Sequence, residues 1–178
     1  ASAREALEVI RAGADGVALG EPTTTLCDWV ADTVGRQAVT ASVDYKGYST
    51  RRGRDLPTYL HFLSGRVGEI LLTNIEREGT GLGLDIQTLR RAREIVKVSC
   101  PLLAGGGANG KDDIQGAFAF ADGVVIGRLL AFTDLSYVQI LAGISTTCPA
   151  PWLGPPVKLE RTADTRPAGR PQARAEAV

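Results

Sequence analysis

The chain has 178 residues, and its 20 basic and 20 acidic side chains leave a formal net charge of zero at pH 7. This length suits one domain with a hydrophobic core rather than two. The balanced charge gives no electrostatic basis for binding nucleic acid or a membrane surface. The sequence has neither an apolar run long enough to span a bilayer nor a secretory signal pattern, so a cytoplasmic protein is expected.

The first half of the chain is predicted to alternate helices with short strands. Apolar residues at helical spacing predict helices over residues 2–12, 25–34 and 57–64. Apolar and β-branched runs predict strands over residues 16–20 and 38–43. Residues 45–55, which contain Lys46 and three arginines, are expected to form a polar loop.

The second half repeats this alternation. Strands are predicted over residues 70–74, 102–104 and 124–127, and helices over residues 85–96, 111–120 and 135–142. Each of these strands runs directly into glycine, polar or charged residues. A parallel α/β sheet whose chemistry lies along one edge is therefore expected.

The chain divides into a structured part, residues 1–145, and a C-terminal tail, residues 146–178. Six of the nine prolines fall in the last 30 residues, mixed with Arg, Ala and Gly. This composition predicts a disordered tail, and a basic docking arm anchored by Trp152 is the alternative. The chain has no methionine and opens within a predicted helix, so it is expected to be a fragment or to have an earlier part elsewhere.

Cysteine and histidine usage gives no sign of a metal site or cofactor. Cys27, Cys100 and Cys148 lack CxxC spacing, which favours ordinary thiols. His61 is the single histidine and falls within a predicted helix, where a structural or surface role is expected. Neither a metal nor a cofactor is predicted.

The sequence contains an internal repeat. Residues 12–20 resemble residues 119–127, at an offset of 107 positions (127 minus 20). Such an offset accommodates four βα units, which is typical of a barrel built from two duplicated halves. The five predicted parallel strands cannot by themselves close a barrel of eight.

The motifs together resemble a known family. The run Gly-Glu-Ile-Leu-Leu-Thr-Asn-Ile-Glu-Arg-Glu-Gly-Thr at residues 68–80, followed by Gly83 and Asp85, is similar to the sixth strand and loop of the cyclase subunit of imidazole glycerol phosphate synthase. Residues 41–46 resemble the fifth strand of that family, and residues 103–108 resemble its seventh. The resemblance implies a partial (β/α)₈ TIM barrel of five parallel strands, corresponding to strands 4–8, without the first three.

The resemblance also implies a function. The chain would belong to a cyclase that uses ammonia from a glutaminase partner to close an imidazole ring on a phosphorylated ribulosyl intermediate in histidine biosynthesis. Asp44 would be one of its two acid/base aspartates, the other belonging to the absent first strand. From the residues alone, Asp44 has the alternative role of capping a loop amide at the strand end.

Several other residues are implicated at the carboxyl ends of the strands, where barrel active sites lie. The glycine loops expose backbone N–H groups that can bind phosphate, although glycine loops also form simple tight turns. Lys46 and its neighbouring arginines form either a lid or a solvated loop. Candidate substrate- and phosphate-binding residues are Thr73, Glu78, Gly79, Thr80, Gly106, Gly107, Gly127 and Arg128.

Two further residues are predicted at the opposite edge of the sheet. Asp15 and Glu69 precede or begin strands, on the face where the resembled family docks its glutaminase; stabilising the barrel floor is the alternative role. The missing N-terminal half of the barrel, or a second copy of the chain, is expected to complete the sheet.

The sequence departs from the family at several positions. The family's Asp-Arg-Asp-Gly-Thr is Glu76-Arg77-Glu78-Gly79-Thr80 here. Gly20 and Glu21 replace a phosphate-holding pair, and a carboxylate there would repel phosphate. Two alternatives therefore stay open: a relative that acts in another amidation pathway, such as surface-sugar modification, and a non-catalytic half-barrel that binds phosphate or serves as a scaffold.

Overall fold

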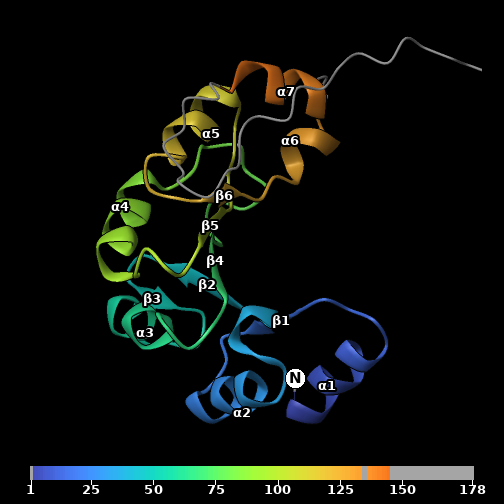
Figure 1. Ribbon diagram of the computed structural model, residues 1–178. Coiled ribbons are helices and arrows are strands. Elements are labelled where there is room, and N and C mark those ends of the chain that lie inside the picture. Colours follow the sequence, from blue (N-terminus) through green and yellow to red (C-terminus); the bar gives the residue numbers. More distant parts are fainter. Residues whose placement is uncertain (1, 134–135, 145–178) are drawn as a thin grey trace, which may run out of the picture.

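The computed structural model describes residues 2–133 and 136–144, in which helices and strands alternate (Figure 1). The strands are β1 (Val17–Gly20), β2 (Val39–Lys46), β3 (Ser49–Thr50), β4 (Glu69–Asn74), β5 (Leu102–Gly105) and β6 (Gly123–Val124). The α-helices are α1 (Ala3–Arg11), α2 (Thr24–Val34), α3 (Leu56–Leu63), α4 (Ile86–Ile95), α5 (Lys111–Ala117), α6 (Arg128–Ala131) and α7 (Tyr137–Gly143), with a 3₁₀ turn at Arg36–Ala38.

Five strands form one parallel sheet in the order β1-β2-β4-β5-β6, and β3 pairs antiparallel with β2. Each parallel strand lies beside the next one along the chain, with a helical connection between them, as in a segment of a TIM barrel. In Figure 1, α1 and α2 lie at the β1 end of the sheet, and α5, α6 and α7 lie at the β6 end. The predicted partial barrel of five parallel strands is confirmed.

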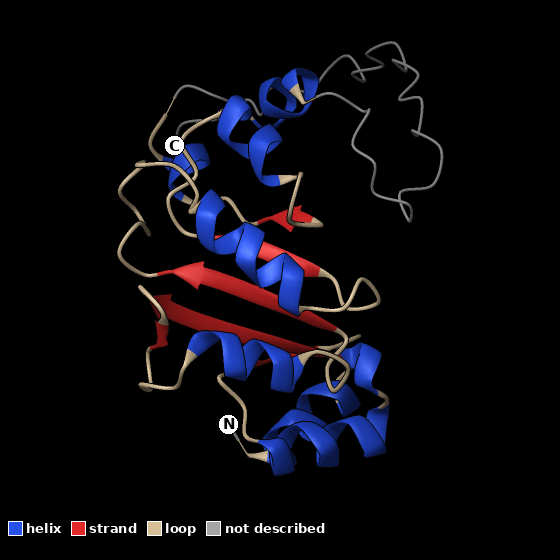
Figure 2. Ribbon diagram, turned by 90° about the vertical axis from the view of Figure 1, so that its left-hand side faces the viewer, coloured by secondary structure: helices blue, strands red, loops and turns tan. Residues whose placement is uncertain are grey.

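The two faces of the sheet differ in exposure. Alternate residues of β2 and β4 are buried, and the residues between them are partly exposed. Because successive side chains point to opposite faces of a strand, one face packs beneath the helices and the other borders open space. Figure 2 shows helices lying along the strands. The partly exposed face carries Asp44 and Thr73, so the same alternation that builds the core presents the candidate site.

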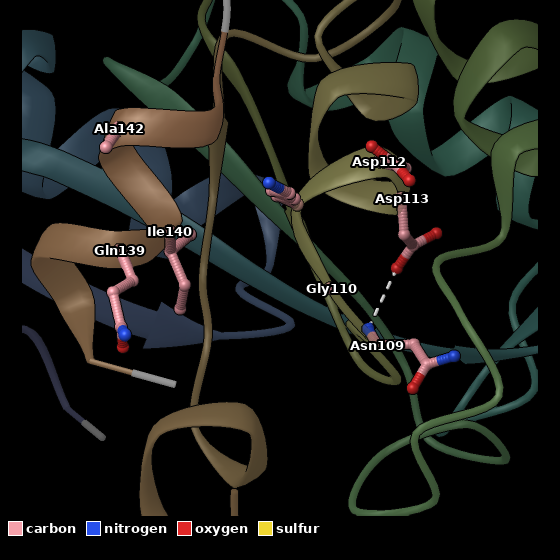
Figure 3. A pocket seen from close by; sticks show the side chains of 8 residues that line it. Asn109, Gly110, Asp112, Asp113, Gln139, Ile140 and Ala142 are labelled. Atoms are coloured by element: carbon pink, nitrogen blue, oxygen red, sulfur yellow. Dashed lines mark hydrogen bonds between the residues drawn. The ribbon is translucent and has the colours of Figure 1, made fainter. Parts of the chain in front are cut away.

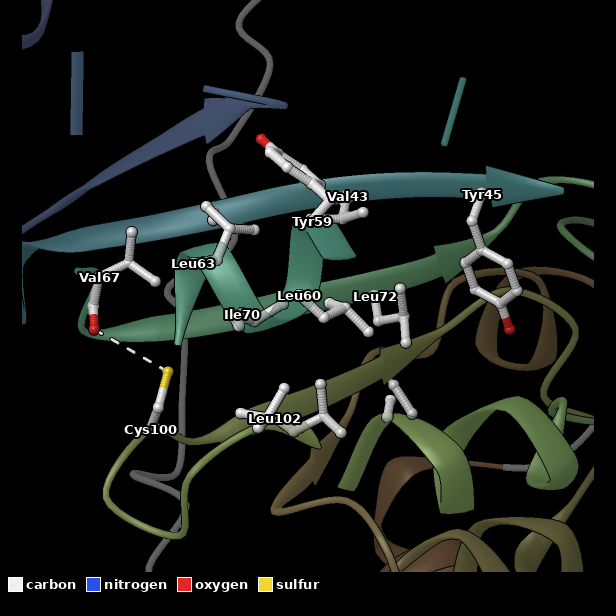
Figure 4. Packing of buried hydrophobic residues seen from close by; sticks show 14 of the residues in the cluster. Val43, Tyr45, Tyr59, Leu60, Leu63, Val67, Ile70, Leu72, Cys100 and Leu102 are labelled. Atoms are coloured by element: carbon white, nitrogen blue, oxygen red, sulfur yellow. Dashed lines mark hydrogen bonds between the residues drawn. The ribbon is translucent and has the colours of Figure 1, made fainter. Parts of the chain in front are cut away.

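The centre of the core lies between α3 and the three middle strands. Figure 4 shows Leu60 and Leu63 of α3 against Ile70 and Leu72 of β4, with Leu102 of β5 beside them. All five side chains are almost fully buried. Burying a leucine or isoleucine side chain contributes roughly 1.5–3 kcal/mol, so this cluster holds the middle strands in register.

Short polar side chains fix where the helices begin. Ser2 and Glu5 form a reciprocal capping box at α1. Thr23 caps α2, Asp55 caps α3 and Asp85 caps α4, each by accepting a backbone N–H of the first turn. These caps satisfy N–H groups that have no partner within the helix.

The segment over residues 45–55 differs from the predicted polar loop. Strand β2 continues through Tyr45 and Lys46, and the chain turns at Gly47 to pair Ser49 and Thr50 with its end. The physical reason is burial, because the Tyr45 ring is 1 % exposed and extends the apolar face of β2. The prediction of a loop over the whole segment was therefore wrong.

The last strand is also shorter than predicted. A strand over residues 124–127 was predicted, but β6 ends at Val124. Helix α6 begins at Arg128. Among the described residues, strand β6 lies at the edge of the sheet and pairs with β5 alone. Val125 still donates its N–H to the Ala104 carbonyl before the chain turns away.

The remaining sequence features bear little on the site. Cys27 and Cys100 are buried free thiols, and burial raises the pKa of Cys27 to about 11, which makes it a poor nucleophile at neutral pH. His61 is exposed on α3. Within the part of the chain that the structure describes, no helix is long and apolar enough to cross a membrane. Cys148 and the predicted tail, residues 146–178, lie outside the described residues.

Candidate active site

A cavity of about 870 Å³ opens at the carboxyl edge of the sheet. We call it the mouth cavity. Its lining comes from β2, β4, β5, the loops that follow β4, β5 and β6, and helix α6. The lining residues are Ser42, Asp44, Leu71, Thr73, Glu78, Gly79, Gly81, Gly105, Gly106, Gly107, Ala108, Val125, Gly127, Arg128, Ala131 and Phe132.

Asp44 lies near the carboxyl end of β2, at the β2 side of the mouth cavity. Strand register places it beside Thr73 of β4, which in turn lies beside Gly105 of β5. Its side chain is 34 % exposed, and one carboxylate oxygen lies 3.8 Å from the guanidinium of Arg51. A partly exposed carboxylate within the cavity can exchange protons with a bound molecule, which is the geometry that acid/base chemistry requires.

Two glycines shape the loop after β5. Gly106 and Gly107 have φ values of +89° and +95°, a conformation that residues with a side chain rarely adopt. A Cβ atom on Gly106 would lie 2.3 Å from the Asn74 carbonyl oxygen, and one on Gly107 would lie 2.6 Å from the Gly83 carbonyl oxygen. Within the described residues, neither backbone N–H donates to a protein acceptor. The loop therefore offers free donors at the cavity wall.

The loop that carries Glu78 and Gly79 is held against the β5 loop. The Asn74 side-chain oxygen accepts the N–H groups of Glu76 and Arg77, at 3.0 and 3.2 Å. The Arg77 guanidinium donates to the Gly83 carbonyl at 3.1 Å, and Gly83 donates its N–H to Gly107 at 2.8 Å. These bonds fix the position of the loop, while Glu78 itself remains exposed and free to face a ligand.

Asp85 anchors the base of the same loop. Its Oδ2 atom accepts from the Thr88 hydroxyl at 2.9 Å, the Asn74 amide at 3.1 Å and the Tyr45 hydroxyl at 3.3 Å. Burial by itself raises the pKa of Asp85, but the Thr88 and Asn74 hydrogen bonds and the Arg77 charge outweigh it and hold the pKa below its usual value. Burial and the Asp85 charge raise the pKa of Tyr45, which keeps its hydroxyl protonated as a donor.

This network predicts a pH-dependent loss of stability when Asp85 is replaced by Asn. Because the folded pKa of Asp85 is lowered, its stabilisation is complete above the unfolded value of about 3.9 and is lost as the pH falls through the folded value. Asp85→Asn should cost about 1–2 kcal/mol at pH 7, and the difference from wild type should shrink toward pH 3. Urea unfolding at both pH values measures this, with the exposed Asp32→Asn variant as control. A difference that does not depend on pH would contradict it.

Of the predicted phosphate-binding residues, one lies outside the mouth cavity. The Thr80 hydroxyl donates to the Arg77 carbonyl at 2.6 Å and accepts the Leu82 N–H at 3.2 Å, so it closes a turn within the loop. The other seven residues line the cavity together with Asp44. Their chemical roles remain predictions, but the structure brings them to one place.

Three of the residues proposed as a lid contact other parts of the protein, although Lys46 and Arg51 remain largely exposed. Lys46 pairs with Glu76 at 3.0 Å, and Arg51 lies near Asp44. The Arg54 guanidinium lies 4.7 Å above the ring centre of Tyr59 and donates to the carbonyls of Glu21 and Pro22. These contacts place residues 46–54 beside the carboxyl ends of β1 and β2.

The two residues predicted at the opposite edge lie at the start of their strands. Asp15 is exposed before β1. Glu69 begins β4 and accepts the Thr40 hydroxyl at 2.6 Å on the partly exposed face of the sheet. Glu69 shares this face with Leu71, two residues further along β4, which lines the mouth cavity. A docking role for Asp15 and Glu69 stays a prediction.

A second cavity of about 750 Å³ lies between the N-terminal end of α5 and helix α7 (Figure 3). Asp112 and Asp113 both line this cavity, and Asp113 forms hydrogen bonds with the protein backbone. The carboxylate accepts the N–H of Leu84 at 2.9 Å and that of Asn109 at 3.0 Å. Asp113 therefore joins the loops that follow β4 and β5. None of the residues that line this second cavity also lines the mouth cavity.

Some residues of the mouth cavity were not predicted. Ser42 lies two residues before Asp44, and the period of two in a strand would have placed it on the same face. Ala131 ends α6 and Phe132 follows it, and their positions depend on the turn after β6, for which the sequence gives no local signal. Among the described residues, no group of three His, Cys, Asp or Glu side chains is placed to hold a metal ion.

The parallel βα order, with loops of successive strands meeting around one cavity, defines a segment of a TIM barrel with its carboxyl-edge site. The family model for "Histidine biosynthesis protein" matches residues 1–136. The chain therefore belongs to the histidine biosynthesis protein family, and the resemblance noted from the sequence is confirmed.

The relatives with similar sequences include subunits of imidazole glycerol phosphate synthase. The chain is 32 % identical over 155 residues to the imidazole glycerol phosphate synthase subunit HisF of Pyrobaculum aerophilum, a match that covers 78 % of this chain and 60 % of the relative. It is 29 % identical over 171 residues to a putative subunit hisF2 of Prochlorococcus marinus, covering 86 % and 62 %. The HisF subunit of Mycobacterium bovis is 30 % identical over 160 residues, covering 77 % and 59 %. The chain thus spans about three fifths of the length of these relatives.

Proposed function

We propose that this chain forms the catalytic carboxyl edge of an imidazole glycerol phosphate synthase cyclase, acting with ammonia on a phosphorylated ribulosyl intermediate. One observation carries the proposal: Asp44 and seven predicted binding residues, drawn from four successive strands and their loops, line a single cavity. Membership of the histidine biosynthesis family and about 30 % identity to HisF subunits support it.

In this proposal the substrate phosphate binds at the β5 and β6 side. The free N–H groups of Gly106 and Gly107 donate to its oxygens, and the Arg128 guanidinium supplies positive charge. The sugar and the reacting carbons then extend along the row from Gly105 through Thr73 to Asp44. Asp44 moves protons during ring closure, and the loop with Glu78 and Gly79 covers the reacting centre.

Ammonia reaches this site, in the same proposal, from a glutaminase docked at the opposite edge near Asp15 and Glu69. The test is an assay of imidazole product formation with either free ammonia or glutamine as nitrogen source. Turnover with ammonia alone, and with glutamine only when a glutaminase is added, is the expected result. Absence of turnover with ammonia in the completed barrel would refute the cyclase proposal.

We further propose that additional strands complete the barrel, because the sheet has two open edges. Strands β1 and β6 each have one parallel neighbour among the described residues, which leaves a row of backbone groups at each edge. We expect the chain, produced alone, to associate through these edges, and light scattering measures this. A stable monodisperse monomer would contradict the proposal that further strands must complete the barrel. It would favour the alternative in which the half-barrel is a binding scaffold.

A further inference from the structure

The loop between β5 and α5 contains an asparagine that is followed directly by glycine. The chain has two asparagines, of which Asn109 precedes Gly110 and Asn74 precedes Ile75. Asn109 is exposed, and neither its side-chain amide nor the Gly110 N–H has a hydrogen-bond partner among the described residues. Figure 3 shows the Asn109 side chain pointing away from helix α7, so that helix does not restrain it.

Gly110 leaves the approach to this side chain open. Its φ of 168° is an extended conformation, and a Cβ atom placed on it would meet no heavy atom within 4 Å outside its chain neighbours. Because glycine has no side chain, its backbone nitrogen is also the least hindered of any residue. Rotation of the Asn109 side chain can therefore bring its Cγ atom to the Gly110 nitrogen, which is the approach that asparagine deamidation requires.

We propose that Asn109 is a site of spontaneous deamidation, and that the product carries a carboxylate beside Arg128 that weakens anion binding in the mouth cavity. In the first step the Gly110 nitrogen forms a bond to Asn109 Cγ, the Cγ–Nδ2 bond breaks, and the Nδ2 group leaves with the Gly110 proton as ammonia. Water then adds to one carbonyl of the resulting succinimide ring and opens it to aspartate or isoaspartate. One water is consumed, one ammonia is released, and no oxidant or reductant takes part.

Asn74 provides the contrast within the same chain. It is 5 % exposed, its Oδ1 atom accepts two backbone N–H groups of its own loop, and its Nδ2 atom donates to Asp85. The next residue, Ile75, is β-branched and donates its N–H to the Tyr45 carbonyl at 3.1 Å. Because its amide is bound and the following nitrogen is hindered and hydrogen-bonded, Asn74 should be stable where Asn109 reacts.

The new carboxylate would lie near the cation of the mouth cavity. A Cβ atom built on Gly81 would lie 2.7 Å from the Arg128 Nη1 atom and 3.6 Å from the Asn109 Oδ1 atom. These two atoms are therefore no more than 6.3 Å apart, the sum of 2.7 and 3.6 Å. Deamidation turns a neutral amide into an anion at this place, and the anion competes with a bound phosphate for Arg128. Only this effect on phosphate rests on the proposed function.

Peptide mapping by mass spectrometry tests the modification on the full chain. After incubation at pH 9, wild type should gain the mass of an amide-to-carboxyl conversion at Asn109 and none at Asn74. The gain should be slower at pH 6, because fewer Gly110 nitrogens are deprotonated. Gly110→Val suits the extended backbone and should react at least about tenfold more slowly, because its β-branched side chain hinders the nitrogen. No gain at Asn109, or equal rates in wild type and Gly110→Val, would overturn the proposal.

Calorimetric titration with inorganic phosphate tests the effect on the mouth cavity. Asn109→Asp reproduces the charge of one product and should bind phosphate about threefold to tenfold more weakly than wild type. Asn109→Gln keeps the amide, and Gln37→Glu adds the same charge before β2 at the opposite edge of the sheet, so both should resemble wild type. Wild-type affinity in Asn109→Asp would overturn the effect on Arg128. If wild type binds no phosphate, the proposed phosphate site fails and this effect with it, whereas the mass measurement still decides the modification.

Discussion

Replacing Asp44 by Asn is expected to lower ammonia-dependent turnover by about 10²- to 10⁴-fold, because the amide cannot exchange a proton with the substrate. The substitution keeps the shape of the side chain, and the ion pair it removes is a distant one, with Arg51 at 3.8 Å and largely exposed. Folding should therefore be little affected, since exposed ion pairs contribute about 0–1 kcal/mol. Steady-state kinetics and an unfolding curve of the same preparation measure both effects.

Glu76→Gln is the matched control for Asp44→Asn. Glu76 lies on the loop after β4 and pairs with Lys46 at 3.0 Å, but it does not line the mouth cavity. Its replacement should leave turnover within about threefold of wild type. If Asp44→Asn retained wild-type turnover, or if both variants lost activity equally, the assignment of Asp44 as the acid/base residue would be wrong.

The largest loss of stability is expected from Leu72→Ala, at about 2–5 kcal/mol. Leu72 is 0 % exposed in the centre of the sheet, on β4 between β2 and β5 and close to Leu60 of α3 (Figure 4). Truncation leaves a cavity among strands and a helix that cannot easily close around it. Since typical domains are stable by only about 5–15 kcal/mol, this variant should unfold at a much lower denaturant concentration.

Leu82→Ala makes the same chemical change at the surface. Leu82 is 71 % exposed on the loop after β4, so its truncation should change the free energy of unfolding by less than about 0.5 kcal/mol. Equal losses in the two variants would mean that the core does not have the arrangement described above.

The strands could be predicted because their apolar runs end abruptly in glycine or polar residues. Strands were predicted over residues 70–74 and 102–104, and the structure places β4 and β5 over nearly the same residues. On one face of each strand the side chains are buried. The β2–β3 hairpin was missed because Lys46, Ser49 and the arginines beyond it read as solvated loop. Its formation depends on burial of Tyr45 and on the hydrogen bonds of Thr50, which are contacts between distant parts of the chain.

The candidate site was predictable to the extent that it follows strand ends. Asp44, Thr73 and Gly106 come directly from that rule. The rule cannot show which side chains are already engaged. Thr80 was predicted to bind phosphate, but its hydroxyl closes a turn within its own loop. Glu21 was expected to repel phosphate, and the structure shows its carboxylate buried against Thr50. Such distinctions arise from hydrogen bonds across many residues, for which a single sequence carries no local signal.

The central claim is that the carboxyl edge of this half-barrel binds a phosphate at the β6 side. The most direct test is the position of the anion in a wild-type crystal soaked in inorganic phosphate. We expect phosphate within hydrogen-bonding distance of the Gly106 and Gly107 N–H groups and beside the Arg128 guanidinium, and the Arg128→Ala variant should bind it more weakly by about tenfold. Phosphate bound only elsewhere on the molecule, or an empty mouth cavity at saturating phosphate, would contradict the claim.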